Sequence, residues 1–325
     1  MNTIRWGIIG CGDVTEVKSG PAFQLVENSA LTAVMRRNGE KAKDYAERHG
    51  VPKWYDKADD LIHDEEVDAV YIATPPSSHK AYTLMAAEAG KPVYVEKPMA
   101  MDTEECRQMV EACFRHNVPL FTAYYRRTLP RFQKVKELLE AGEIGEVRFT
   151  SSQQTQKQVE KNDDGQWPWR VLPEVSGGGL FYDVGAHTLD LLDYLLGPVK
   201  SVKGKATNLS ADYPAEDTVS GTWEFDSGVV GTGLWNYSSY KNEDMNRIVG
   251  TKGEIQFSTF DHQPVKLIKE TSEQSFMIDH PKHIQYYLIE SIVKQLLGEG
   301  TSPSTGETAL RTNWVMEEFV KDYYQ

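Results

Sequence analysis

The sequence has few cysteines, no run of basic residues and no long apolar segment. Its three cysteines form an odd, sparse set without Cys-x-x-Cys spacing, for which a reducing cytoplasm is the simplest setting. No apolar run approaches the roughly 20 residues that span a bilayer, and no signal peptide is expected at the start. A net charge of −13 argues against nucleic acid as the main partner.

The first part of the chain alternates short apolar segments with amphipathic ones. We expect strands at 4–9, 31–35, 53–55, 67–74, 93–96 and 120–123, with helices at 40–49, 57–63, 79–89 and 103–116 between them. This alternation predicts an α/β domain with a doubly wound parallel sheet. At 325 residues the chain is long enough for about two domains, and we expect the first to cover 1–122.

The turn after the first predicted strand is rich in glycine. Gly10, Gly12 and Thr15 form a G-x-G-x-x-T pattern in which Gly10 permits a tight turn and Gly12 lets a pyrophosphate approach the backbone. Asp13 and Val14 open the helix whose N-terminus would face that phosphate. Any tight strand-to-helix turn can contain such glycines. Thr15 stands where glycine or alanine is usual, so we expect slightly looser packing there.

The end of the second predicted strand carries positive charge. Folds that prefer NAD usually place an acid there for the ribose 2′-hydroxyl, but this chain has Arg36 and Arg37 followed by Asn38. Guanidinium groups bind phosphate in a bidentate manner, so the pattern favours NADP over NAD. Two solvated loop arginines remain the alternative.

A third feature is the hexapeptide Val93–Pro98, with sequence VYVEKP. Val93, Tyr94 and Val95 suit a buried strand, and a charged pair directly after them suits the point where the strand leaves the sheet. In open α/β sheets ligands bind at that edge. Lys97 is therefore a candidate functional residue, although an ordinary strand-end lysine facing water would have the same sequence.

Beyond residue 122 the pattern changes to strands with few helices between them. Segments near 147–152, 199–209, 217–225, 229–239, 246–250, 254–258 and 264–269 are separated by turn residues. They predict a second domain, 123–325, with an open-faced, mostly antiparallel meander. Helices are expected at 130–141, 282–297 and 306–324, and the C-terminal helix could pack back on the first domain.

One glycine-rich segment interrupts these strands. Gly177–Gly179 form a flexible approach to a predicted helix that carries Asp183, His187 and Asp190 on one face. Gly185 within that helix suggests that something approaches its backbone closely. A hydrogen-bonded Asp–His pair is one alternative. A metal site is another, but no third ligand is evident nearby, so no metal is expected.

Together these motifs make the chain resemble the Gfo/Idh/MocA family of NAD(P)-dependent oxidoreductases. The resemblance rests on Gly10-Cys11-Gly12, Ala73-Thr74-Pro75-Pro76 with His79, Glu96-Lys97-Pro98, and the Gly177–Asp190 segment. It implies a Rossmann domain followed by a sheet used for homodimer or homotetramer contacts. It also implies that Lys97, Asp183 and His187 are catalytic and that Thr74, Pro75, His79, Glu96 and Lys97 line the cofactor site. Candidate pocket walls are Tyr124, Arg126, Trp169 and Arg170.

The resemblance further implies hydride transfer between NADP(H) and a sugar, cyclitol or related polyol. In that reaction His187 would take the hydroxyl proton, Asp183 would orient the imidazole or hold substrate hydroxyls, and Lys97 would bind the reacting oxygen. The roles of Lys97 and His187 could be exchanged. A trans-dihydrodiol dehydrogenase-like enzyme and a non-catalytic NADP- or sugar-sensing regulator are alternatives. A regulator would be expected to lose one of the three residues, and all are present.

Overall fold

A computed structural model describes residues 2–325. The chain divides into two compact units. Unit 1 is the chain up to Thr128 together with Pro281–Leu310, and unit 2 is Leu129–His280 together with Arg311–Gln325. This division differs from the expected boundary near 122, since the first crossing lies six residues later and 281–310 return to the first unit.

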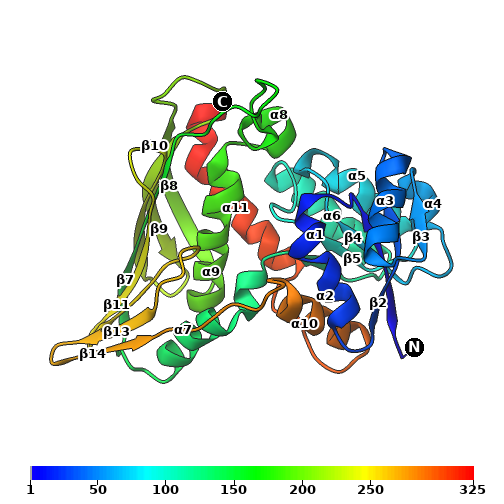
Figure 1. Cartoon of the computed structure of the whole chain (residues 1–325). Helices are drawn as coiled ribbons and strands as arrows, with labels where there is room; N and C mark the ends of the chain where they lie inside the picture. Colours follow the sequence, from blue (N-terminus) through cyan, green and yellow to red (C-terminus); the bar gives the residue numbers. More distant parts are fainter. Residues whose placement is uncertain (1) are drawn as a thin grey trace. The chain divides into compact units, whose positions relative to one another are not determined.

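Unit 1 is built on a parallel six-stranded sheet in the order β3-β2-β1-β4-β5-β6 (Figure 1). The strands are β1 Ile4–Ile9, β2 Ser29–Met35, β3 Lys53–Tyr55, β4 Ala69–Ile72, β5 Val93–Val95 and β6 Leu120–Thr122. The side chains of β1, β4, β5 and β6 are almost all buried, as expected for strands covered on both faces. The order reverses beside β1, which is where doubly wound sheets bind dinucleotides.

Helices of unit 1 connect these strands, except α10, which comes from the later segment 281–310. They are α1 Asp13–Val17, α2 Gly20–Leu25, α3 Gly39–His49, α4 Ala58–Ile62, α5 His79–Glu88, α6 Thr103–Arg115 and α10 Tyr286–Leu296. Short 3₁₀ turns lie at Pro76–Ser78 and Tyr125–Thr128. The expected helix near 40–49 begins at an Asn38 side-chain cap and ends at Gly50 in the left-handed conformation, which are ordinary start and stop signals. Helix α10 packs against α2 within unit 1.

Unit 2 contains a mixed eight-stranded sheet in the order β14-β13-β12-β11-β7-β10-β9-β8. The strands are β7 Val147–Lys157, β8 Val199–Thr207, β9 Thr218–Phe225, β10 Val230–Ser239, β11 Glu243–Gly250, β12 Glu254–Phe257, β13 Val265–Lys269 and β14 Ser272–Phe276. The sheet is mostly antiparallel, as expected, but it is not a simple meander. Strand β7 lies in the middle, parallel to β10 and antiparallel to β11.

Helices cover one face of this sheet (Figure 1). The helices of this unit are α7 Pro130–Glu140, the short α8 Pro173–Ser176, α9 Ala186–Leu196 and α11 Gly306–Tyr324, with a 3₁₀ turn at Trp169–Val171. Helix α11 begins in unit 1, which includes its residues up to Leu310. The core between sheet and helices is aromatic: Phe319 of α11 packs edge-on against Trp223, Trp235 and Phe181. The other face carries alternating exposed side chains, so the sheet is open on that side.

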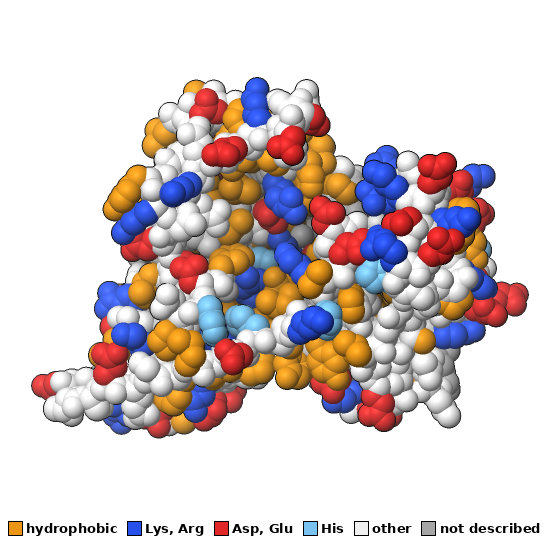
Figure 2. Space-filling model, viewed as in Figure 1, with side chains coloured by type: hydrophobic (Ala, Val, Ile, Leu, Met, Phe, Trp, Pro, Cys, Tyr) orange, Lys and Arg blue, Asp and Glu red, His pale blue; other side chains and the backbone are white. Residues whose placement is uncertain are grey.

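Charged side chains of both signs are interspersed over the visible face of each unit, without a continuous basic stripe on that face (Figure 2). Among residues 2–325 no helix is both long and apolar enough to cross a membrane. All three cysteines are buried and free. Burial raises the pKa of Cys11 to about 11 and that of Cys113 to about 12, so neither is a reactive thiolate near neutral pH.

Candidate active site

The glycine turn after β1 has the conformation that the sequence predicts. Gly10 has a φ of +93°, and a Cβ atom there would lie 2.7 Å from the Thr74 side chain. At Gly12 the nearest atom to a Cβ would be a carbonyl oxygen 3.8 Å away, so this side of the turn is open to a bulky group. A pyrophosphate needs such an approach to backbone N–H groups. The turn therefore fits a dinucleotide.

Packing behind this turn is tighter than Thr15 led us to expect. Thr15 is fully buried, and its hydroxyl donates to the Gly12 carbonyl at 2.7 Å. The Tyr45 hydroxyl donates in turn to the Thr15 carbonyl at 2.9 Å. Farther along α1, Glu16 pairs with Arg48 and His49 of α3. These contacts fix the short helix α1 although it has only five residues.

Arg36 and Arg37 follow the last residue of β2. The Arg36 guanidinium lies at the glycine turn, where Nη1 is 3.5 Å from the Cys11 carbonyl oxygen, while Arg37 is exposed. The adjacent Asn38 caps α3 by accepting from the Lys41 N–H. No carboxylate occupies the end of β2 itself, so the local charge suits an anionic group.

The loop after β4 contains three predicted cofactor residues, Thr74, Pro75 and His79. The Ser78 hydroxyl donates to the Thr74 hydroxyl at 2.8 Å. The buried His79 ring lies between backbone carbonyls, with Nε2 2.7 Å from the Thr74 oxygen and Nδ1 3.1 Å from the Pro98 oxygen. Burial lowers the pKa of His79 below its usual value. Its ring thus joins this loop to the segment after Lys97.

Glu96 and Lys97 lie directly after β5, at the carboxyl edge of the sheet. The buried Glu96 carboxylate accepts from the Tyr71 hydroxyl at 2.6 Å, from Gln285 Nε2 at 2.7 Å and from the Lys97 backbone N–H at 3.2 Å. Such bonds offset the cost of burying a carboxylate. Tyr124 and Arg126 follow β6, and the Arg126 guanidinium stacks over the Tyr125 ring at 5.0 Å. Unit 1 thus brings the glycine turn, the 74–79 loop and Lys97 to one edge of its sheet.

In unit 2 the predicted helix begins differently from expectation. Phe181–Gly185 form one turn of π-helix, and the α-helix starts only at Ala186. A π turn accommodates an extra residue and so changes the direction of side chains on either side of it. Single π turns of this kind are frequent at functional sites. Asp183 lies inside the turn, whereas His187 and Asp190 lie on α9.

The glycines of this segment are held by packing rather than being flexible. Gly177 has a φ of +83° and ends α8. A side chain at Gly178 would collide with the Tyr182 ring, and one at Gly179 with Glu216. At Gly185 the close neighbour is the ring of Phe181. The approach to the Gly185 backbone that we expected is therefore made by the protein's own side chain.

Asp183 has a cationic partner that sequence reasoning did not assign to it. Arg170 Nε lies 3.0 Å from the Asp183 carboxylate, and the same guanidinium stacks over the Trp169 ring at 4.5 Å. One predicted pocket residue, Arg170, therefore contacts a predicted catalytic residue within unit 2, and a second, Trp169, stacks on Arg170. The His187 ring packs edge-on against Phe260, and Asp190 accepts from the Thr312 hydroxyl at 3.3 Å.

Two further polar residues support these segments and were missed from sequence. Glu216 is fully buried and receives the Gly179 N–H at both carboxylate oxygens. Gln285 is also fully buried and donates to Glu96. Each lies far along the chain from the residue it contacts, and neither belongs to a motif. Only the fold brings them there.

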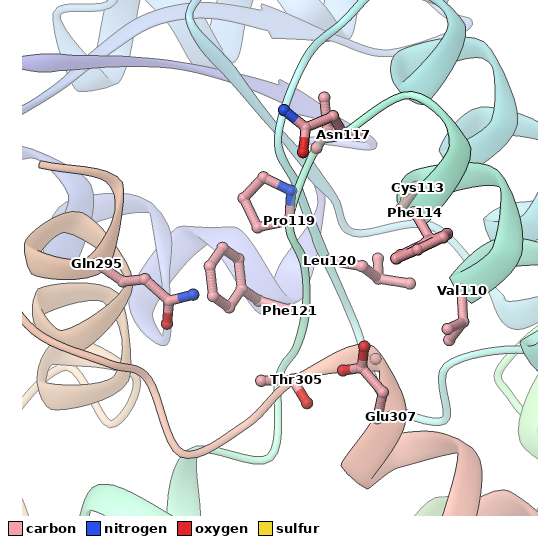
Figure 3. A pocket seen from close by; sticks show the side chains of 12 residues that line it. Val110, Cys113, Phe114, Asn117, Pro119, Leu120, Phe121, Gln295, Thr305 and Glu307 are labelled. Atoms are coloured by element: carbon pink, nitrogen blue, oxygen red, sulfur yellow. The ribbon is translucent and has the colours of Figure 1, made fainter. Parts of the chain in front are cut away.

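A separate pocket lies in unit 1 (Figure 3). It has a volume of about 290 Å³ and is lined by residues that include Val110, Phe114, Pro119, Gln295 and Glu307. Pro119 immediately precedes β6, so the pocket adjoins the amino end of that strand, whereas Lys97 follows the carboxyl end of β5. The pocket therefore contains none of the predicted site residues. Within 2–325 no three His, Cys, Asp or Glu side chains are grouped to hold a metal ion.

Comparison with known families gives two matches that together cover most of the chain. Residues 4–124 match the oxidoreductase family with an NAD-binding Rossmann fold, GFO/IDH/MocA. Residues 132–256 match the GFO/IDH/MocA C-terminal domain. The two matches fall on the two kinds of sheet described above, and each includes one of the predicted catalytic segments.

Individual proteins are also similar to this chain in sequence or structure. An oxidoreductase from Formosa agariphila is 41% identical over 320 residues, which are 97% of this chain and 98% of that protein. D-xylose 1-dehydrogenase (NADP(+)) from Haloarcula marismortui is 29% identical, with a match that covers 83% of this chain and 77% of that protein. The structure of levoglucosan dehydrogenase in complex with NADH and levoglucosan has a TM-score of 0.87 at 21% identity, covering 99% of this chain and 97% of that one. The last likeness concerns the fold.

Proposed function

We propose that this chain, which belongs to the Gfo/Idh/MocA family of NAD-binding oxidoreductases, transfers a hydride between NADP(H) and a secondary alcohol or carbonyl of a sugar, cyclitol or related polyol. The family predicted from the motifs is confirmed, as are the oxidoreductase class and the fold. The observation that carries the proposal is that one edge of the parallel sheet holds both the Gly10–Gly12 turn and Lys97. That edge is where a dinucleotide and its substrate bind in such sheets.

In the proposal a bound nicotinamide supplies the hydride acceptor or donor. The Lys97 ammonium donates a hydrogen bond to the reacting oxygen and stabilises its alkoxide character as the hydroxyl proton leaves. His187 takes that proton as general base, and the usual pKa of a histidine, near 6.5, suits the task. Exchanged roles for Lys97 and His187 remain the alternative, and a pH profile of each variant distinguishes them.

Asp183 and Arg170 act together in this proposal. A partly exposed salt bridge contributes little to stability. The Arg170 guanidinium can nevertheless fix the orientation of the carboxylate, because the two groups are in direct contact. We infer that Arg170 holds Asp183 in one rotamer, so that its second oxygen can orient His187 or bind a substrate hydroxyl. The stacking of Arg170 on Trp169 restrains the guanidinium in turn.

The cofactor preference follows from the charge beside the glycine turn. We propose NADP over NAD because Arg36 lies at the turn and no acid follows β2 for a ribose 2′-hydroxyl. The relative from Haloarcula marismortui carries NADP in its name, which supports this choice. Titration of the protein with NADPH and NADH, followed by nicotinamide fluorescence, tests it. Equal affinities would contradict it.

The remaining predicted cofactor residues hold backbone segments in place or line the nicotinamide site in this proposal. The His79 ring lies between the Thr74 carbonyl of the 74–79 loop and the Pro98 carbonyl, and Glu96 holds the N–H of Lys97. Thr74 and Pro75 form the wall of the nicotinamide site. Tyr124, Arg126 and Trp169 are proposed walls of the substrate pocket.

We also propose a homodimer or homotetramer through the open face of the unit 2 sheet. Exposed apolar side chains project from its central strands: Phe149, Val230, Leu234 and Met245. The strand register pairs Phe149 with Val230, and Gln153 with both Leu234 and Met245, so they form two rows on this face. The row of Ser151, Thr232 and Arg247 lies between them. Apolar patches of this kind mark interfaces. Mass measurement in solution, with Leu234→Lys as the variant, tests the proposal.

Turnover of a substrate panel tests the function itself. Sugars, cyclitols, other polyols and an aromatic trans-dihydrodiol are assayed with NADP and with NAD at several pH values. We expect turnover of at least one polyol or sugar, and a fall in kcat of roughly 10²- to 10⁴-fold in Lys97→Met or His187→Gln. Turnover of the dihydrodiol alone would favour the alternative enzyme. Nucleotide binding without any turnover, unchanged in Lys97→Met, would favour a sensing regulator.

A further inference from the structure

Gln285 makes an unusual set of contacts just before helix α10. Its side chain is fully buried, and both ends of its amide are used. Nε2 donates to Glu96 Oε1 at 2.7 Å, and Oε1 accepts from the Tyr94 hydroxyl at 2.7 Å. Flipping the amide would place oxygen against carboxylate, so these partners allow one orientation only.

The Glu96 carboxylate is fully engaged by the same cluster. Oε1 accepts hydrogen bonds from Gln285 Nε2 and from the Tyr71 hydroxyl, while Oε2 accepts one from the backbone N–H of Lys97. Tyr71 and Tyr94 come from adjacent strands, and their rings stack with centroids 4.7 Å apart. Bonds to a buried charge are stronger than neutral ones. The cluster therefore fixes the carboxylate that holds the chain where Lys97 leaves β5.

The same short segment also reaches the nucleotide turn. The Gln285 N–H donates to the Lys18 carbonyl at 3.3 Å, and a ring nitrogen of His283 lies 2.6 Å from the Val17 carbonyl oxygen. Val17 and Lys18 end α1, the helix that starts after Gly12. Residues 283–285 thus contact both the end of the nucleotide helix and, through the Gln285 side chain, the Lys97 strand.

We propose that Gln285 is a positioning residue for Lys97, acting through the Glu96 carboxylate. This rests on the role proposed above for Lys97. Without the amide donor the carboxylate loses one of its three partners and can turn, and the N–H of Lys97 then loses its fixed acceptor. A displacement of about 1 Å at a reacting group can lower a rate by roughly 100-fold. The backbone contacts to α1 remain, so nucleotide binding is preserved.

The first test compares Gln285→Leu with wild type on a substrate that wild type turns over. We expect kcat to fall roughly 10- to 100-fold, with the Kd for NADPH unchanged. Tyr94→Phe, which removes only the hydroxyl that holds the amide, is expected to lower kcat to a smaller extent. This second variant keeps the test valid if Gln285→Leu folds poorly. Glu290→Gln on α10, where a partly exposed carboxylate pairs with Lys294, is the matched control and should behave as wild type.

A conservative variant gives a readout that a merely structural role would not show. Gln285→Glu places a second acid against Glu96, and the two would share a proton at low pH. We expect its kcat relative to wild type to rise as pH falls, because the introduced carboxyl group, once protonated, can again donate to Glu96. A flat ratio across the pH range would contradict the proposal.

A further measurement does not depend on turnover. Acylation of lysines by an amine-directed reagent, read by mass spectrometry, compares Lys97 with Lys91 in one sample. Lys91 donates to the carbonyls of Asp64 and Val67 and is an internal reference. Gln285→Leu should change the labelling rate of Lys97 and leave Lys91 unchanged. Unchanged labelling and kcat in both Gln285→Leu and Tyr94→Phe would overturn the positioning role, even where Lys97→Met is inactive. If the wild-type protein turned over no substrate, the proposed function would be wrong. The labelling of Lys97 would still test whether Gln285 positions it.

Discussion

Both carboxylate oxygens of Glu216 receive the backbone N–H of Gly179, at 2.9 and 2.8 Å. Glu216 precedes β9, and Gly179 precedes the π turn that carries Asp183. The Tyr324 hydroxyl, from the end of α11, also donates to this carboxylate. The glycine segment is thus anchored to the sheet and to the C-terminal helix by one buried acid. This anchor makes the local stability of unit 2 depend on pH.

Glu216→Gln is expected to stabilise the protein more at high pH than at low pH. Burial raises the pKa of Glu216 to about 7, from a usual value of 4.5. The folded state therefore favours the neutral acid, so the stability from this group is complete below pH 4.5 and is lost as pH rises through 7. Above pH 7 the loss amounts to roughly 3 kcal/mol.

Melting temperatures at pH 5 and pH 8 check this prediction. The neutral amide does not ionise, so the Tm of Glu216→Gln relative to wild type should increase by several degrees between these two values, since about 1 kcal/mol shifts Tm by about 2–4 °C in a domain of this size. Glu224→Gln, an acid on β9 that pairs with Lys200 at the surface, is the control. A constant difference between variant and wild type would show that Glu216 is already ionised at pH 5.

Glu16 should give the opposite dependence. Hydrogen bonds from Arg48 lower its pKa to about 2, against a usual 4.5. Its stabilising contribution is therefore present above pH 4.5 and is lost as pH falls toward 2. Both side chains are partly exposed, so Glu16→Gln is expected to cost less than about 1 kcal/mol at pH 7. Urea unfolding of variant and wild type at pH 7 and pH 3 should show the gap narrowing in acid.

Gly179→Ala is expected to disturb the Asp183 turn. A Cβ atom there would lie 2.5 Å from the Glu216 carbonyl oxygen and 2.9 Å from its carboxyl carbon, so the loop or the acid must move. Overpacking of this kind costs about 1–3 kcal/mol. Gly300→Ala is a control, because its nearest neighbour would be 3.9 Å away. Equal Tm values for the two variants would show that the glycine loop can shift freely.

The site residues that were predicted from the sequence follow local patterns, whereas the residues that were missed are brought to the site by contacts between distant parts of the chain. The strand just before Lys97 and the glycine turn at Gly10 were predictable because apolar runs and turn glycines are local signals. Gln285 lies 189 residues from Glu96, and no spacing rule connects them. Helix α10, which begins directly after Gln285, was predicted from its amphipathic pattern, but such a pattern does not say which unit the helix covers.

Unit 2 shows the same limit. Alternation predicted most of its strands, but it does not choose partners, and the parallel pairing of β7 with β10 followed from no local pattern. The prediction for the helix at Asp183 assumed a regular α-helical spacing throughout. The π turn at Phe181–Gly185 depends instead on packing, since the Phe181 ring occupies the space that only a glycine at 185 leaves open. Such a contact cannot be deduced from residue spacing.

Arg36→Asp is expected to reverse the cofactor preference. The Arg36 guanidinium lies beside the glycine turn, where it can form charge-assisted bonds with a 2′-phosphate, and losing them should weaken NADPH binding by roughly 10- to 100-fold. The new carboxylate repels that phosphate and can accept the 2′-hydroxyl of NADH, so NADH affinity should hold or rise. Fluorescence titrations of both nucleotides measure this. Arg148→Gln, an exposed arginine in unit 2, should change neither affinity, and a parallel loss for NADPH and NADH in Arg36→Asp would mean that Arg36 supports the turn without discriminating the phosphate.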